Sequence, residues 1–268
     1  MKCFLINLDR SPERLGFFDA QASKYGMPYE RIPGVDGRQL SDIECDRMRS
    51  DHFDFQPINP GEIGLFLSHR SIWTRLIDQD LPYAAVFEDD AVVSPDIESV
   101  LMAIDAARPA VDIIKLETTG RKVVTESASQ PLGKTHRLHK LLSWHGGTAG
   151  YVVTHAGARK LLEATWPLAD PIDQVMFHPL SRVRPQLRVM QLEPAVCIQK
   201  NILEKSGVDP VFNTTIDRHA SRGPMFRHGL WVDLRRAWKK HLERRLRRRL
   251  AGQPGHRYQV VPLFEPWT

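Results

Sequence analysis

LPYAAVFEDD, residues 81–90, joins an apolar run of strand length to three consecutive carboxylates. The run from Leu81 to Phe87 predicts a buried strand. In sheets flanked by helices, ligands collect at the carboxyl ends of the strands. The three acids therefore mark the end of this strand as the place where chemistry is expected.

Strands and helices alternate on both sides of this stretch. Such alternation is typical of the α/β class, in which helices cover a central sheet. We therefore predict an α/β fold. The expected strands are residues 3–7, 29–32, 81–87 and 111–116, and the expected helices are residues 13–25, 61–78 and 95–107.

The second half of the chain gives weaker signals. Residues 118–135 are rich in Thr, Ser, Gly and Lys, and we predict a mobile loop or lid there. Strands are expected near residues 137–142, 150–154 and 187–192, within an otherwise loop-like region that reaches residue 227. We therefore divide the chain into a catalytic domain, residues 1–227, and a C-terminal helical tail, residues 228–268.

Bulk composition places the chain among ordinary globular proteins. It has 268 residues, of which 42% are hydrophobic and 26% charged. No run approaches the roughly 20 apolar residues of a membrane-spanning helix, and the charges in MKCFLINLDR do not suit a signal peptide. We expect a cytoplasmic protein whose three separated cysteines, Cys3, Cys45 and Cys197, are reduced and structural.

Positive charge is concentrated in one segment. The formal net charge is +5, but residues 235–250 carry nine Lys or Arg and one Glu, a balance of +8 that leaves −3 for the rest. A uniformly basic surface is not indicated, so no nucleic-acid partner is expected. Apolar residues recur in this region at steps of three or four: Trp231, Leu234, Trp238, Leu242, Leu246 and Leu250.

This spacing predicts a basic amphipathic helix. We favour docking of residues 230–250 on an anionic membrane surface, where aromatic rings enter the headgroup region and cations meet lipid phosphate. Two alternatives stay open: a terminal helix packed on the catalytic core, and an RNA-binding helix.

The acidic triplet Glu88-Asp89-Asp90 needs a cation if it is buried, because stacked negative charge at a strand end is costly. Oxygen ligands favour Mn²⁺ or Mg²⁺, ions that leave coordination positions open for the oxygens of a diphosphate. The alternative is an ordinary acidic turn with all three carboxylates in water.

Several separated segments resemble the bacterial lipooligosaccharide glycosyltransferases of family 25, which include relatives of collagen galactosyltransferase domains. The resemblance covers roughly residues 1–200, in family order. It implies a GT-A-like single Rossmann-type domain with a mixed central sheet, and UDP-galactose as the usual nucleotide-sugar donor. The matching segments are INLDRSPER at 6–14, PGVDG at 33–37, GEIGLFLSHRSIW at 61–73, LPYAAVFEDDAVV at 81–93, GGTAGYVVTHAGARKLL at 146–162 and PIDQVM at 171–176.

The resemblance also implies roles for individual residues. Asp90, with Glu88, is the expected metal ligand, and Glu88 and Asp89 are expected to contact the donor ribose. For the remaining nucleotide-sugar contacts it implies Asn7, Leu8, Arg10, Arg14, Asp36, His69, Gly147 and Thr148, to which we add Lys115 from its place at the end of an expected strand.

Several of these residues also suit ordinary structural roles. Arg14 fits a solvated helix face, and Asp36 fits a tight turn. His69 either touches the donor or braces the acidic loop. We place Lys115 and Glu117 on opposite faces of their strand, so that at most one lines the cleft, and we choose Lys115.

An acceptor hydroxyl needs a general base, and Asp173 is the candidate. Helix capping explains an Asp at that place equally well. The resulting hypothesis is an inverting, metal-dependent transfer of galactose to a lipooligosaccharide or lipid-linked saccharide at the inner face of the inner membrane. The alternative is a non-catalytic, membrane-associated assembly factor that keeps the fold.

Overall fold

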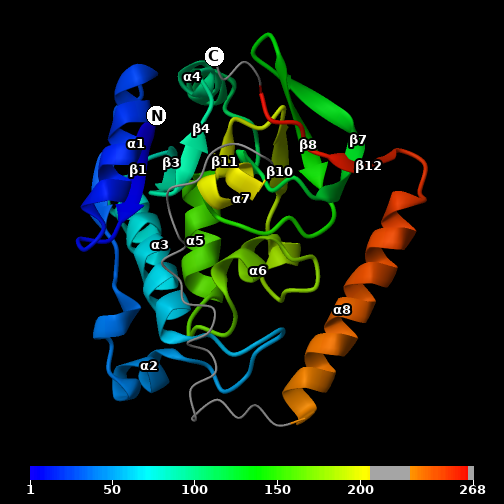
Figure 1. Cartoon of the computed structure of the whole chain (residues 1–268). Helices are drawn as coiled ribbons and strands as arrows, with labels where there is room; N and C mark the ends of the chain where they lie inside the picture. The colour runs from blue at the N-terminus through cyan, green and yellow to red at the C-terminus, as the bar shows by residue number, and fades with distance from the viewer. Residues whose placement is uncertain (206–229, 265–268) are drawn as a thin grey trace.

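The computed structural model describes residues 1–205 and 230–264, and its centre is a mixed sheet with helices on both faces (Figure 1). In this part of the chain the main sheet has nine strands, in the order β12-β7-β8-β10-β5-β9-β3-β1-β2. Its strands are β1 (Lys2–Asn7), β2 (Glu30–Pro33), β3 (Tyr83–Glu88), β5 (Ile113–Lys115), β7 (Lys122–Leu132), β8 (His136–Leu141), β9 (Gly150–Thr154), β10 (Val189–Glu193) and β12 (His256–Val260).

A small sheet lies beside the ends of β3 and β5. Its strands, in the order β4-β11-β6, are β4 (Ala91–Val93), β11 (Cys197–Gln199) and β6 (Glu117–Thr118). The α-helices are α1 (Pro12–Lys24), α2 (Asp42–Met48), α3 (Pro60–Asp78), α4 (Ile97–Ala107), α5 (His155–Ala164), α6 (Ile172–Phe177), α7 (Lys200–Lys205) and α8 (Leu230–Ala251). The predicted α/β fold with a mixed sheet and a helical C-terminal region is confirmed.

Strand direction brings distant segments to one edge of the main sheet. β1 pairs in parallel with β2 and β3, while β9 runs antiparallel between β3 and β5. The start of β9 therefore lies beside the carboxyl ends of β3 and β5. This edge holds the acidic triplet.

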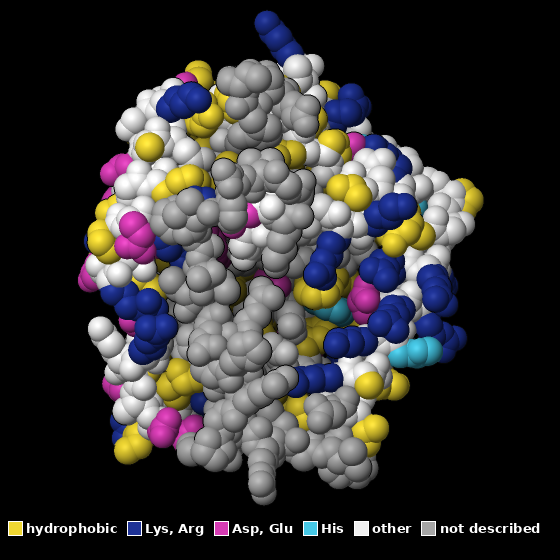
Figure 2. All heavy atoms as spheres, viewed as in Figure 1, with side chains coloured by type: hydrophobic (Ala, Val, Ile, Leu, Met, Phe, Trp, Pro, Cys, Tyr) yellow, Lys and Arg dark blue, Asp and Glu magenta, His cyan; other side chains and the backbone are white. Residues whose placement is uncertain are grey.

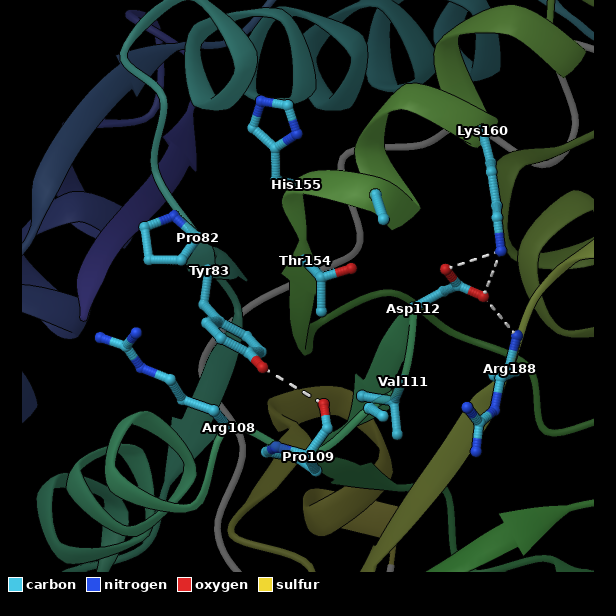
Figure 3. Close-up of a pocket in the computed structure, with 12 residues that line it drawn as sticks. Pro82, Tyr83, Arg108, Pro109, Val111, Asp112, Thr154, His155, Lys160 and Arg188 are labelled. Carbon is cyan, nitrogen blue, oxygen red and sulfur yellow. Dashed lines mark hydrogen bonds and ion pairs between the residues drawn. The ribbon is translucent and has the colours of Figure 1, made fainter.

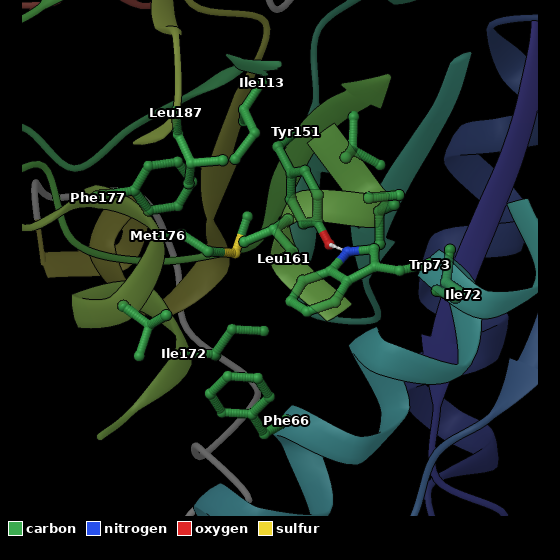
Figure 4. Packing of buried hydrophobic residues seen from close by; sticks show 14 of the residues in the cluster. Phe66, Ile72, Trp73, Ile113, Tyr151, Leu161, Ile172, Met176, Phe177 and Leu187 are labelled. Atoms are coloured by element: carbon green, nitrogen blue, oxygen red, sulfur yellow. Dashed lines mark hydrogen bonds between the residues drawn. The ribbon is translucent and has the colours of Figure 1, made fainter. Parts of the chain in front are cut away.

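The core has two halves because side chains of a strand alternate between the faces of the sheet. Cys3 and Leu5 of β1 face the side covered by α1 and α4. Phe4 and Ile6 face the side covered by α3, α5 and α6. On that second side the rings of Phe66 and Trp73 cross nearly at right angles, 6.1 Å apart (Figure 4).

Local sequence signals explain where helices begin. Asn59 accepts a hydrogen bond from the Glu62 amide, and the Glu62 carboxylate accepts one from the Asn59 amide, which starts α3. The same reciprocal pattern between Ser41 and Glu44 starts α2, a helix that we did not predict. The Ser-x-x-Glu spacing was the available signal.

The predicted loop at residues 118–135 is wrong. Most of it is β7, which pairs antiparallel with both β8 and β12. Only Val123 and Val124 form an apolar pair, and much of the remaining strand faces solvent, so its composition resembles that of a loop. Its backbone is held by partners that local sequence cannot reveal.

The predicted tail helix is present as α8, and the chain then returns to the main sheet as β12. α8 contacts both β7 and β12. No described helix is long and apolar enough to cross a membrane. The predicted boundary between residues 227 and 228 lies outside the described residues.

Candidate active site

Asn7 at the end of β1 links the first strand to the acidic triplet. Its amide nitrogen donates to Asp89 Oδ2 at 2.8 Å, and its side-chain oxygen accepts from Arg31 at 3.0 Å. The Arg14 guanidinium lies 2.6 Å from Asp89 Oδ1 and 3.0 Å from Asp90 Oδ2. Arg14 is only 6% exposed, so the structure places it against the carboxylates and not on a solvated helix face.

Glu88 is held from the side of α3. The His69 Nε2 atom lies 3.4 Å from Glu88 Oε1, which also accepts a hydrogen bond from the Thr148 hydroxyl. Trp73 Nε1 donates to the Tyr151 hydroxyl at 3.0 Å, and that hydroxyl lies 2.9 Å from His69 Nδ1 (Figure 4). If the hydroxyl donates to Nδ1, the neutral ring carries its proton on Nε2, which faces Glu88.

This chain of contacts bears on the two roles left open for His69. The ring is fully buried, and its contacts are with Tyr151 and Glu88. His69 therefore braces the acidic loop. Its contact with Glu88, together with that of Thr148, lowers the pKa of the Glu88 carboxyl against the effect of burial, which is the largest influence and raises it.

Asp90 differs from Glu88 and Asp89 in how its carboxylate oxygens are hydrogen-bonded. Its Oδ1 atom is buried and accepts no hydrogen bond from the described residues. Burial, and then the charge of Glu88, raises the pKa of Asp90 to about 7. A carboxylate that is partly buried, close to other acids and only partly satisfied is well suited to bind a cation or a ligand hydroxyl.

The structure corrects our assignment of Lys115 and Glu117 to opposite faces of their strand. Residues two apart on an extended chain share a face, and here Lys115 Nζ lies 2.6 Å from Glu117 Oε1 in a fully buried ion pair. Lys115 also donates to the Gly147 carbonyl at 2.6 Å, and Glu117 accepts from the Ala149 amide at 3.1 Å. These two hydrogen bonds hold the backbone of residues 147–149 against the ion pair.

The glycine loop, residues 146–149, lies between this pair and Asp173. Gly147 has φ +86° and a Cβ there would lie 2.8 Å from Glu117 Oε2, so only glycine fits. Its amide donates to Asp173 Oδ2 at 3.2 Å. Asp173 stands in the first turn of α6 and is partly exposed, and burial raises its pKa.

The predicted nucleotide residues on the other side of the triplet also lie together. Arg10 Nε lies 2.5 Å from Asp36 Oδ2, and Asp36 caps a short 3₁₀ turn, Gly37–Gln39. The Leu8 carbonyl accepts from the Ser11 amide at 2.9 Å at the start of α1. Arg10 and Asp36 therefore form a polar rim beyond β1 and β2.

Acidic side chains outnumber basic ones around the triplet. The charges of Glu88 and Glu117 raise the pKa of Asp90, and those of Glu88 and Asp173 raise the pKa of Glu117, in each case after the larger effect of burial. Five acidic side chains therefore accompany two basic ones at this strand end, an excess of acids that a divalent ion would reduce. The acids are Glu88, Asp89, Asp90, Glu117 and Asp173, and the cations are Arg14 and Lys115.

The same residues do not form a complete metal cage. Among the described residues, no three His, Cys, Asp or Glu side chains are grouped so that they could hold a metal ion. The buried Asp90 Oδ1 and the oxygen-only chemistry fit an ion held jointly by the protein and by phosphate oxygens.

A shallow hollow of about 550 Å³ lies at the opposite ends of β3 and β5, next to Tyr83 and Asp112 (Figure 3). Lys160 donates to both carboxylate oxygens of Asp112 at 2.9 Å, and the Arg188 amide donates to Asp112 Oδ2 at 2.7 Å. The buried acid is fully satisfied. We therefore assign the hollow no role.

Two parts of this site were not predicted from the sequence. Glu117 was set aside because its side of the strand was misjudged. Tyr151 and Trp73 resembled ordinary core residues, since their hydroxyl and indole groups act only through His69. The two-residue spacing of Lys115 and Glu117 was the signal that could have identified the first.

Residues 1–176 match the family described as "Glycosyltransferase family 25 (LPS biosynthesis protein)". The match spans more than half of the chain and includes every residue assigned above to the strand-end site. The protein therefore belongs to glycosyltransferase family 25.

Among its relatives is the lacto-N-neotetraose biosynthesis glycosyltransferase LgtE of Neisseria meningitidis, which is 28% identical over 96% of this chain and 98% of its own length. A glycosyltransferase 25 family member of Anopheles gambiae is 33% identical over 66% of this chain. The chain spans about a third of the length of such insect relatives. A glycosyltransferase involved in the glycosylation of the major capsid of PBCV-1 aligns with a TM-score of 0.39 and 11% identity, over 74% of this chain and 93% of its own, a likeness too distant to bear on the site.

Proposed function

We propose that this protein transfers galactose from UDP-galactose to a lipooligosaccharide or a lipid-linked saccharide, with inversion and with the help of a divalent metal. The observation that carries the proposal is the carboxylate of Asp90, which is 15% exposed and whose buried Oδ1 atom is unsatisfied by any described residue, at the strand end within the part of the chain that matches the family. The names of LgtE and of a further relative, the Haemophilus influenzae lipooligosaccharide biosynthesis protein lex-1, support the class of acceptor.

The nucleotide would lie across the ends of β1 and β2. Arg10 and Asp36 offer a cation and an acceptor there, and Asn7 ties this strand to Asp89. Arg14 already serves Asp89 and Asp90, so we assign it to positioning these acids. Its role is then to keep the acids in place while the nucleotide binds.

Asp90 and Glu88 would hold Mn²⁺ or Mg²⁺, which when bound stabilises negative charge on the diphosphate leaving group. His69 and Thr148 fix the orientation of Glu88, so little reorganisation is needed when the nucleotide-sugar arrives. Lys115 and Glu117 fix the glycine loop in the same way.

Asp173 would take the proton from the acceptor hydroxyl as that oxygen attacks the anomeric carbon. The Gly147 amide aims the carboxylate, and partial exposure leaves it reachable. Its raised pKa makes it a stronger base than a solvated aspartate. Direct attack of this kind inverts the anomeric configuration.

A panel of UDP-sugars tests the proposal against the assembly-factor hypothesis. We expect UDP release and transfer to be fastest with UDP-galactose, to require Mn²⁺ or Mg²⁺, and to disappear in Asp90→Asn. The alternative predicts no turnover with any UDP-sugar, together with loss of function when residues 230–250 are removed.

Membrane docking through α8 is the remaining part of the proposal. The helix packs beside β7 and β12, yet Leu234 and Trp238, one turn apart, are 51% and 57% exposed. Lys and Arg side chains gather over this side of the molecule (Figure 2). Exposed cations flank Leu234 and Trp238: Arg235, Lys240, Arg244, Arg245, Arg248 and Arg249. Such a surface suits an anionic bilayer at the inner face of the inner membrane, where a lipid-linked acceptor is presented.

Vesicle binding tests this surface. Replacing Leu234 and Trp238 by Ser is expected to weaken binding to phosphatidylglycerol vesicles about tenfold, because two apolar side chains no longer enter the headgroup region. Ile43→Ser, at an equally exposed residue of α2, is the control and should change nothing. Equal binding to neutral phosphatidylcholine vesicles would contradict the role of the cations.

A further inference from the structure

Trp144 lies beside the proposed general base and has no part in the mechanism described so far. It follows β8 and precedes the glycine loop, and its side chain is partly exposed. A Cβ on Gly146 would lie 3.1 Å from Asp173 Oδ2 and 3.2 Å from Trp144 Cζ2. The indole and the carboxylate therefore border the same glycine.

The indole ring of Trp144 packs at one end of a row of aromatic rings. The Trp144 ring centroid lies 5.5 Å from that of His178, which in turn lies 4.3 Å from that of Phe55. His178 is buried, and burial lowers its pKa to about 4, so it packs as a neutral ring. Trp144 is the partly exposed end of this row.

Trp144 and the residue that follows Asp173 each have one unsatisfied polar atom. Trp144 Nε1 and Gln174 Oε1 are buried and have no hydrogen-bond partner in the described part of the chain. Gln174 is the next residue after Asp173. Since more than about nine in ten buried polar groups in proteins are paired, a donor and an acceptor left over beside a base point to a ligand that supplies both.

The order of the main sheet separates Trp144 from the nucleotide rim. That rim follows β1 and β2 at one edge, whereas Trp144 follows β8. β3, β9, β5 and β10 lie between these strands. The glycine loop and Asp173 occupy the interval, so Trp144 stands on the far side of the base from the nucleotide.

We infer that Trp144 is the stacking platform for the acceptor sugar, with Gln174 as its polar neighbour. The inference rests on the proposed transferase function. A hexopyranose presents an apolar face of C–H groups and a rim of hydroxyls, which matches an indole face beside an amide oxygen. Stacking on Trp144 would set one hydroxyl against Asp173.

Kinetics with separate readouts for the two substrates test this assignment. UDP-galactose hydrolysis without acceptor reports the donor side, and transfer to a soluble methyl β-glucoside, methyl β-galactoside or methyl β-N-acetylglucosaminide reports the acceptor side. In Trp144→Ala we expect the acceptor KM to rise about tenfold, with donor KM and hydrolysis unchanged. Trp144→Phe, which keeps an aromatic face, should raise it by no more than about threefold.

Trp166→Ala is the control, because that tryptophan is 51% exposed and its ring contacts Arg70. An acceptor KM in Trp144→Ala within twofold of wild type would overturn the platform. Loss of donor hydrolysis in both Trp144→Ala and Trp144→Phe would also overturn it, since the indole would then support the donor or the fold. Absence of hydrolysis and transfer in the wild type would instead refute the transferase function itself.

Discussion

Buried acids at the two ends of the central sheet differ in how their charges are satisfied. At the start of β5, Asp112 accepts three hydrogen bonds, two of them from Lys160. Near the ends of β3 and β5, Asp90 Oδ1 and Glu117 Oε2 are buried and receive none from the part of the chain that the structure describes. The acid at the first end is satisfied within the protein, whereas those at the second end keep unsatisfied oxygens, as the proposed ligand site requires.

Replacing Asp90 and Asp112 by Asn should have opposite consequences. In Asp90→Asn we expect turnover to fall at least about a hundredfold, since the metal loses its main ligand. Without metal, the free energy of unfolding should stay the same or rise, because one of five crowded carboxylates becomes neutral.

In Asp112→Asn the free energy of unfolding should fall by about 2 kcal/mol, because the buried side chain can no longer accept all the hydrogen bonds from Lys160 and the Arg188 amide, while turnover is unchanged. Urea denaturation and steady-state kinetics measure both quantities. The same sign of stability change in the two variants would contradict the difference between the two ends.

The second largest effect is expected at Asp173. Asp173→Asn should lower kcat about a hundredfold with little change in donor KM, because general-base catalysis is lost. Asp170→Asn is the matched control, since within the described residues Asp170 accepts hydrogen bonds from the backbone amides of Asp54, Phe55 and Gln56, and its replacement should affect stability alone. Full activity in Asp173→Asn would exclude it as the base.

A smaller effect is expected at the buried ion pair. Glu117→Gln should lower kcat about tenfold, because an uncompensated Lys115 disturbs the glycine loop. Adding Lys115→Met to this variant should restore part of the lost stability, and double-mutant kinetics and denaturation would show the coupling. Strictly additive effects would show that the two residues do not act as a pair.

The smallest effect on turnover is expected at His145, which influences how stability depends on pH. Burial, followed by the charge of Lys115, lowers the pKa of His145 from 6.5 to about 3. Its Nδ1 donates to Gln191 Oε1 at 2.7 Å and its Nε2 accepts from the Thr119 amide at 3.2 Å, so only the neutral ring fits.

Because the unfolded chain binds the proton first, the stability from His145 is complete above pH 6.5 and declines as pH falls toward 3. At pH 5 the loss is about 2 kcal/mol. Urea midpoints across this range should depend less on pH in His145→Gln than in the wild type. Identical pH profiles would contradict the assignment of the neutral tautomer.

Local patterns were enough to predict much of this molecule. The strand before Glu88, the helix from residue 61 and the basic helix near the C-terminus each carry a periodic signal along one segment. β7 and β12 lack such a signal because their pairing joins residues more than 120 positions apart. The long-range partners of a strand decide whether a polar sequence becomes part of a sheet.

The candidate site was predicted as a set of residues, but their contacts were not. Asn7, Arg14 and the acidic triplet were chosen by resemblance, and only the structure shows Arg14 against Asp89 and Asp90. Trp144 and Tyr151 gave no signal, since an aromatic residue near a strand usually belongs to the core. Each of them matters through one polar atom, the indole nitrogen of Trp144 and the hydroxyl of Tyr151.

The linkage between UDP, Mn²⁺ and Asp90, measured as the thermal midpoint of unfolding, is the sharpest test of the proposed metal site. We expect UDP and Mn²⁺ together to raise the midpoint of the wild type well above the effect of either alone, and Asp90→Asn to lose this joint effect. A midpoint raised equally by UDP without metal, or raised to the same extent in Asp90→Asn, would refute metal binding by the acidic triplet.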